Sequence, residues 1–105
     1  MIQRDKLESR YAGRAAFVER LLGVFASTHA PLSGELRRAV ENGDALGIAR
    51  LAHQIKGSAG NVMDSDLQLL AQRTEHAARE MRPEGIELAL DLADALDLTL
   101  AAIDT

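Results

Sequence analysis

The 105-residue sequence contains no cysteine and no tryptophan, and aromatic residues make up only 3% of it. Without cysteine there is no disulfide framework and no thiolate chemistry. No apolar run approaches the roughly 20 residues that a membrane-spanning helix needs, and the N-terminus lacks the apolar stretch of a signal peptide. We therefore expect a cytoplasmic domain that makes no membrane contact.

The chain also lacks an excess of positive charge, since 12 Lys and Arg residues stand against 16 Asp and Glu residues. No basic stripe with interleaved aromatic residues is present, so we expect no nucleic-acid binding. The three histidines, His29, His53 and His76, include no pair at i,i+4 and no HExxH motif. The sequence therefore predicts no metal site.

The residues that are abundant favour helices. Hydrophobic residues make up 47% of the chain and are mostly Ala and Leu, which lose little rotamer freedom in a helix. A chain of this length is the size of one ordinary domain, so we expect a single domain over residues 1–105. Residues 1–12 are mixed and polar, and we interpret them as a short extension with one helix near Asp5–Tyr11.

Apolar residues recur every three or four positions from Phe17 to Val40, which predicts one helix face. Pro31 lies inside this pattern, but the register continues across it, so we expect one long, kinked helix rather than two. Three more helices are expected, over residues 44–62, 65–81 and 84–103. With the first, they predict an all-α fold, an antiparallel four-helix bundle with a short N-terminal extension.

The helix over residues 44–62 carries a histidine on its polar side. Its apolar residues share one face, and His53 falls roughly 160° from Ile55 on a helical wheel, so we expect His53 to face solvent. The neighbours of His53 on the outer face are Leu46, Arg50, Lys56, Gly57 and Gly60.

These neighbours indicate a group that accepts and returns phosphate. Two glycines inside a helix each cost about 1 kcal/mol relative to alanine, and Gly57 at i+4 clears space for another protein to approach the imidazole. Arg50 and Lys56 supply positive charge for a phosphoryl group. Histidine side chains titrate near neutral pH, so an exposed imidazole is a competent nucleophile.

The segment His53–Asn61, HQIKGSAGN, resembles the phosphoacceptor signature H-x-L-K-G-S-A-G-N of histidine-containing phosphotransfer (HPt) domains. The resemblance covers roughly residues 14–80, with the lead-in Ala39–Asp44 before the motif and Leu67, Leu70 and Glu75 after it. It implies that His53 is phosphorylated and that Lys56 assists electrostatically. A partner would dock on the residues around His53, which are Leu46, Arg50, Gln54, Gly57, Gly60 and Asp64.

The sequence departs from the family where Met63-Asp64 replaces the usual Gly-Ala. Methionine could bulk the helix end or add an adaptable apolar contact to the docking face. Asp64, at i+11, returns to the side of His53, so we expect its charge to influence the choice of partner. The run Gly57–Asn61 has a second interpretation as an ordinary helix C-cap and turn. It is not a phosphate-binding P-loop, because it lacks the glycine spacing of that motif.

The resemblance implies a phosphoryl carrier that accepts a phosphoryl group on His53 from the aspartate of a response-regulator receiver domain and passes it to another receiver. We expect no cofactor, with magnesium on the receiver, and no ATP site. The chain would act as a monomer, either freestanding or as a domain of a hybrid sensor kinase. One alternative is a non-catalytic docking module, which Met63 and Asp64 favour. A homodimerisation domain built on Leu88, Leu90 and Leu98 is the other.

Overall fold

The computed structural model describes residues 2–103, and every regular element in that range is an α-helix. The predicted all-helical class is therefore confirmed. The helices are α1 Arg4–Arg10, α2 Ala15–His29, α3 Leu32–Glu41, α4 Ala45–Asn61, α5 Ser65–Arg79 and α6 Glu84–Ile103. This count differs from the four helices and short extension that the sequence predicts. None of these helices is long and apolar enough to cross a membrane.

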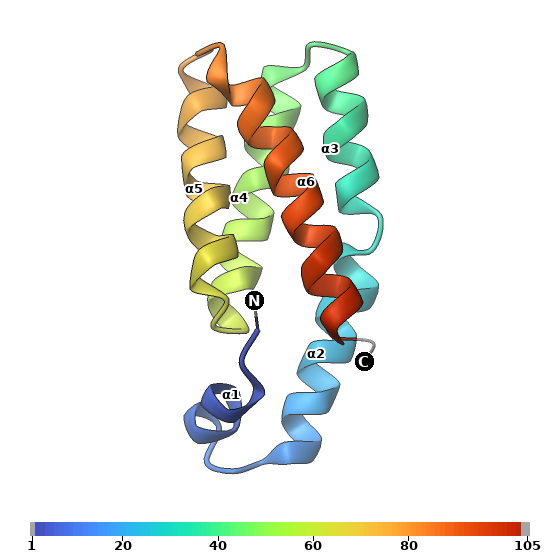
Figure 1. The fold of residues 1–105 in the computed structure, drawn as a ribbon, viewed down its shortest axis with the longest axis vertical. Helices are drawn as coiled ribbons and strands as arrows, with labels where there is room; N and C mark the ends of the chain where they lie inside the picture. The colour runs from blue at the N-terminus through green and yellow to red at the C-terminus, as the bar shows by residue number, and fades with distance from the viewer. Residues whose placement is uncertain (1, 104–105) are drawn as a thin grey trace.

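The prediction of one long helix across Pro31 is wrong, because the structure has two helices, α2 and α3, separated at Ala30 and Pro31. Pro31 has no N–H, so the helical hydrogen-bond series is interrupted there. Both residues nevertheless keep right-handed helical dihedrals, φ −50° and ψ −41° at Ala30 and φ −80° and ψ −12° at Pro31. The chain therefore keeps its direction across the break, and α3 continues upward from α2 in Figure 1.

Helices α3, α4, α5 and α6 lie side by side in Figure 1, and successive long segments run in opposite directions. The most extensive contact is between α4 and α5, while α6 packs on both α5 and α3. Helix α1 lies beside α2, below the loop that joins α4 to α5. Because α6 crosses in front of α4 in this view, the outer face of α4 points away from the viewer.

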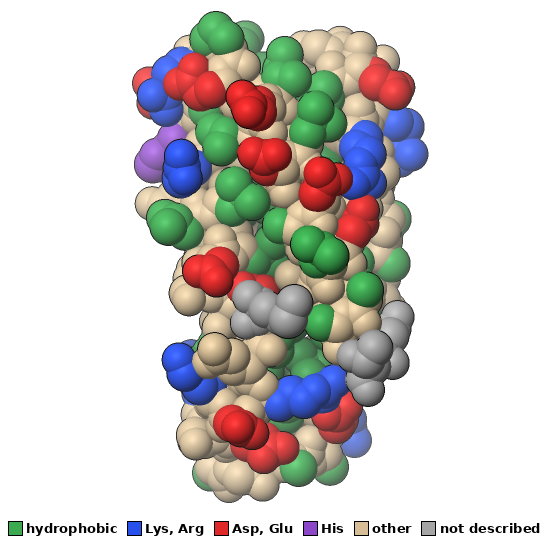
Figure 2. All heavy atoms as spheres, in the orientation of Figure 1, with side chains coloured by type: hydrophobic (Ala, Val, Ile, Leu, Met, Phe, Trp, Pro, Cys, Tyr) green, Lys and Arg blue, Asp and Glu red, His purple; other side chains and the backbone are tan. Residues whose placement is uncertain are grey.

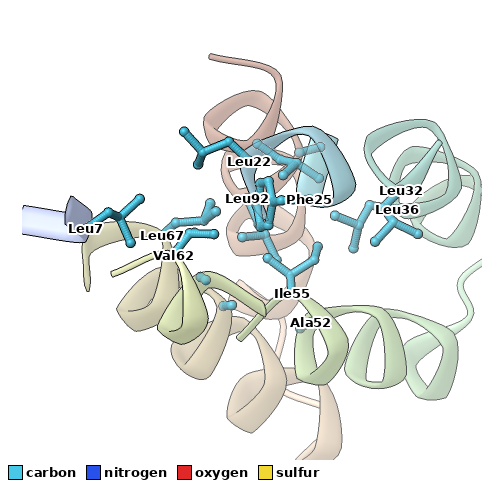
Figure 3. Packing of buried hydrophobic residues seen from close by; sticks show 14 of the residues in the cluster. Leu7, Leu22, Phe25, Leu32, Leu36, Ala52, Ile55, Val62, Leu67 and Leu92 are labelled. Carbon is cyan, nitrogen blue, oxygen red and sulfur yellow. The ribbon is translucent and has the colours of Figure 1, made fainter. Parts of the chain in front are cut away.

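The core is formed by hydrophobic side chains from all six helices. Leu22 and Phe25 of α2, Ile55 of α4 and Leu92 of α6 meet inside the molecule (Figure 3). Leu7 of α1 is fully buried in the same cluster, and Ile2 and Tyr11 pack against it, so three side chains tie the N-terminal segment to the core. Burying a side chain of this size contributes about 1.5–3 kcal/mol, which explains why a seven-residue helix keeps its place.

Aspartate caps mark where α4 and α5 begin, and a tight turn marks where α4 ends. Asp44 caps α4 by accepting a hydrogen bond from Gly47 N–H at 2.9 Å, and Asp64 caps α5 by accepting one from Leu67 N–H at 3.1 Å. Helix α4 ends in a Schellman motif, in which Met63 N–H bonds to Gly60 and Asp64 N–H to Ala59. Met63 therefore has a left-handed φ of 57°.

Candidate functional site

His53 lies in the middle of α4 and faces solvent, as the helical wheel predicts. Its side chain is 64% exposed, whereas Ala52 and Ile55 beside it are fully buried. The whole motif up to Asn61 belongs to α4, so the alternative interpretation of Gly57–Asn61 as a C-cap and turn is wrong. The rigid centre of a helix thus holds the imidazole above the protein surface.

A glutamate on the neighbouring helix holds the imidazole ring. Nδ1 of His53 lies 2.9 Å from Oε2 of Glu75 in α5. Glu75 also accepts hydrogen bonds from Lys56 Nζ at 2.6 Å and from Arg79 Nη2 at 2.8 Å. One carboxylate therefore joins the histidine to two cations, and these four side chains form the His53–Glu75 cluster.

The carboxylate at the centre of the cluster is ionised although it is only 4% exposed. Burial alone would raise the pKa of Glu75, but hydrogen bonds from Lys56, Arg79 and His53 outweigh it and lower the pKa to about 2. An ionised carboxylate can only accept hydrogen bonds. In the neutral imidazole the proton therefore sits on Nδ1, and Nε2 carries the free lone pair. The cluster thus presents the exposed side of the ring as a nucleophile.

The two glycines of the motif have different surroundings. A Cβ added at Gly57 would meet nothing within 4 Å, so the space beside His53 is open. A Cβ at Gly60 would lie 2.7 Å from Nε2 of Gln68 in α5. The amide of Gln68 therefore fills the space beside Gly60, so Gly60 does not open the docking surface as Gly57 does. Gly57 alone supplies open space.

The other predicted docking residues on α4 are exposed. Leu46 is 68% exposed at the start of the helix, and Arg50 and Gln54 lie on the surface beside His53. Arg50 and Gln54 line an open polar depression of about 390 Å³ between α3 and α4, together with Arg38. These side chains are placed where an approaching protein would meet them.

Asp64 does not lie on this surface, so its prediction as a docking residue is wrong. It is 1% exposed, and its carboxylate accepts from Leu67 N–H and, at 3.3 Å, from the hydroxyl of Thr99 in α6. The carboxylate is needed to cap α5, which explains its burial. Met63 likewise packs against the core rather than the docking face. The departures from the family pattern are features of the α4–α5 connection.

The remaining histidines stand apart from His53. His76 is exposed on α5. His29, near Pro31, is 2% exposed and stacks on Phe25 with ring centroids 4.2 Å apart. Within residues 2–103 no group of three or more His, Cys, Asp or Glu side chains could hold a metal ion.

Glu75 is the functional residue that sequence reasoning missed. It is 22 positions from His53 along the chain, and only the register between α4 and α5 brings the two together. Its signal was present, because Glu75 falls among Thr74, Ala77 and Ala78 on the inward face of a predicted helix. A carboxylate on a buried face requires partners, and the nearest candidates were the cations of the motif.

The chain matches the family model of the Hpt domain over residues 20–105. The match covers most of the chain, which therefore belongs to the Hpt domain family. Hpt domains act in histidine phosphotransfer within phosphorelays and interact with receiver domains. Searches of curated proteins and of solved structures return no match for this chain.

Proposed function

We propose that His53 carries the phosphoryl group, receiving it from the aspartyl phosphate of a receiver domain and passing it to a second receiver. The observation that supports this is the imidazole of His53, 64% exposed on α4 with its Nδ1 held by Glu75. Such an arrangement leaves Nε2 as the reacting atom.

In the proposed step the lone pair of Nε2 attacks phosphorus in line with the bond to the aspartyl oxygen. The new N–P bond forms as that P–O bond breaks, and the aspartate leaves as a carboxylate. The ring gains positive charge while Nδ1 keeps its proton, and Glu75 stabilises this charge from 2.9 Å. Return of the phosphoryl group reverses the same bond changes.

Lys56 acts in this step through charge. Its ammonium group is bound to Glu75 and is partly exposed one turn from His53. It therefore keeps Glu75 anionic and adds positive potential near the transferred group. We assign no cofactor to this chain, and we place the Mg²⁺ that neutralises the phosphoryl oxygens on the receiver domain.

We propose that the receiver docks on the outer face of α4, over Leu46, Arg50, Gln54 and Gly57. Leu46 offers an apolar contact, Arg50 a positive charge and Gly57 an open space. The receiver belongs to a response regulator or to a hybrid sensor kinase, and the domain acts as a cytoplasmic monomer. Leu90 and Leu98, two of the three candidates for a dimer contact, are exposed on α6, where acidic side chains separate the hydrophobic ones (Figure 2), and the third, Leu88, is half-buried.

The test is transfer from a phosphorylated receiver domain with Mg²⁺, followed by intact-mass measurement. We expect one phosphoryl adduct that acid removes and that the His53→Ala variant does not form. The matched control is His76→Ala, which removes an exposed histidine from α5 and should leave the adduct unchanged. Binding without an adduct across a broad panel of receivers would favour the docking module instead.

A further inference from the structure

Arg79 of α5 belongs to the His53–Glu75 cluster, but the phosphotransfer step assigns it no role. Its Nε and Nη2 donate hydrogen bonds of 3.1 Å and 2.8 Å to Oε2 of Glu75. The same oxygen lies 2.9 Å from Nδ1 of His53, whereas Lys56 binds the other oxygen, Oε1, at 2.6 Å. The histidine and the arginine therefore share one oxygen of the carboxylate.

This arrangement differs from the common pairing of arginine with a carboxylate, in which two parallel N–H donors bind the two oxygens. Here both donors of Arg79 converge on Oε2, while Lys56 occupies Oε1. The guanidinium charge is thus placed at the atom that holds the ring of His53. The two cations of the cluster are therefore not interchangeable.

The charges around the ring determine how readily it gains a second proton. The charged side chains that adjoin His53 are Arg50 and Lys56 on α4 and Glu75 and Arg79 on α5. A carboxylate beside an imidazole favours the cationic, doubly protonated ring, and a nearby positive charge disfavours it. A doubly protonated ring has no lone pair on Nε2 and cannot attack phosphorus.

We propose that Arg79 is a positioning residue for phosphotransfer, which offsets the charge of Glu75 and so keeps His53 in its neutral, reactive form. Glu75 orients the ring through Nδ1, but its negative charge also attracts a proton to Nε2. Arg79 preserves the first effect and weakens the second, because it binds the oxygen that Nδ1 binds. This role rests on the phosphotransfer function proposed for His53, but its effect on the ring is measurable without any transfer.

The first readout is a pH titration of the ring nitrogens of His53 by NMR, in the full chain with ¹⁵N-labelled histidine. In Arg79→Gln we expect the midpoint of ring protonation to rise by about 0.5 to 1 pH unit. Arg79→Lys keeps the positive charge and should keep the midpoint. Arg73→Gln is the matched control, since Arg73 is exposed and lies two positions before Glu75, on the opposite side of α5. Arg79 is 56% exposed, so we expect its variants to fold, which thermal unfolding checks.

The second readout is single-turnover transfer from a phosphorylated receiver, as the ratio of the variant's rate to that of the unaltered chain at each pH. Arg79→Gln should be about 3- to 10-fold slower below the midpoint and equally fast well above it, where both rings are neutral. Equal slowing at every pH would overturn the positioning role and indicate a direct contact of Arg79 with the receiver. An unmoved midpoint, in a chain that does form the adduct, would overturn the role of Arg79 alone. Absence of the adduct from the unaltered chain would overturn the phosphotransfer function itself.

Discussion

The open space beside His53 can be filled with a single methyl group. Gly57 lies in the middle of α4, is exposed, and an added Cβ meets nothing within 4 Å. Alanine is about 1 kcal/mol more favourable than glycine inside a helix. Gly57→Ala should therefore stabilise the domain by up to about 1 kcal/mol and raise Tm by about 4–8 °C.

The same methyl group should slow phosphotransfer. It lies one turn from His53 on the docking face, where a receiver must bring its aspartyl phosphate to within bonding distance of Nε2. A displacement of about 1 Å of the reacting groups lowers a rate by about 100-fold, so we expect transfer to be about 10- to 100-fold slower. The assay is single-turnover transfer from a phosphorylated receiver, beside thermal unfolding of the same sample.

Gly23→Ala is the matched control. Gly23 is also an exposed glycine inside a helix, α2, and a Cβ there meets nothing within 4 Å. This variant should raise Tm by a similar amount and leave the transfer rate unchanged. If Gly57→Ala transferred phosphate at the rate of the unaltered protein, the lack of a side chain at residue 57 would not be what allows the receiver to approach His53. A lower Tm for Gly57→Ala would contradict the open geometry at this position.

Three further predictions concern Glu75 and Met81. Glu75→Gln keeps the size of the side chain but removes the charge that orients His53, so phosphotransfer should slow about 10- to 100-fold. The control Glu87→Gln changes an exposed glutamate on α6 and should leave the single-turnover rate unchanged. Because the folded-state pKa of Glu75 is about 2 and its ordinary value is 4.5, the unfolded state binds the proton first as pH falls. Its contribution to stability, about 3 kcal/mol, is present above pH 4.5 and is lost by about pH 2, and acid unfolding of Glu75→Gln should lack this component. Met81 is 71% exposed and has a left-handed φ of 56°, a conformation that glycine adopts at less cost than methionine. Met81→Gly should therefore stabilise the domain by about 1 kcal/mol in urea unfolding. Gln72→Gly, inside α5, should destabilise it by a similar amount. Stabilisation by Gln72→Gly, or equal effects of the two glycine substitutions, would contradict the assigned helix ends.

The helix that carries the site was predictable because its signals are local. The apolar period places His53 opposite Ile55, and Asp44 marks the start of α4; both features are confirmed. The break between α2 and α3 at Pro31 was not predictable, since the apolar register continues through it while the helical hydrogen-bond series does not. Local patterns thus predict which face is buried better than they predict where a helix is interrupted.

The contacts between helices were beyond the local pattern. Asp64 was predicted to face a partner from its position at i+11, but a residue after the helix end no longer follows the helical period. The contact of Gly60 with Gln68 and the contact of Glu75 with His53 depend on how α5 packs against α4. No residue spacing within α4 reveals this packing. Met63 shows the same limit, because its left-handed φ follows from the Schellman motif that turns the chain into α5.

The measurement that tests the central claim most directly is the position of the phosphoryl group on the imidazole. The domain, labelled with ¹⁵N in its histidine rings, is phosphorylated by a receiver and examined by NMR through the coupling of ring nitrogens to phosphorus. We expect coupling at Nε2 of His53, with Nδ1 still protonated and bound to Glu75. Phosphorus on Nδ1, or on a residue other than His53, would contradict the proposed role of the His53–Glu75 cluster.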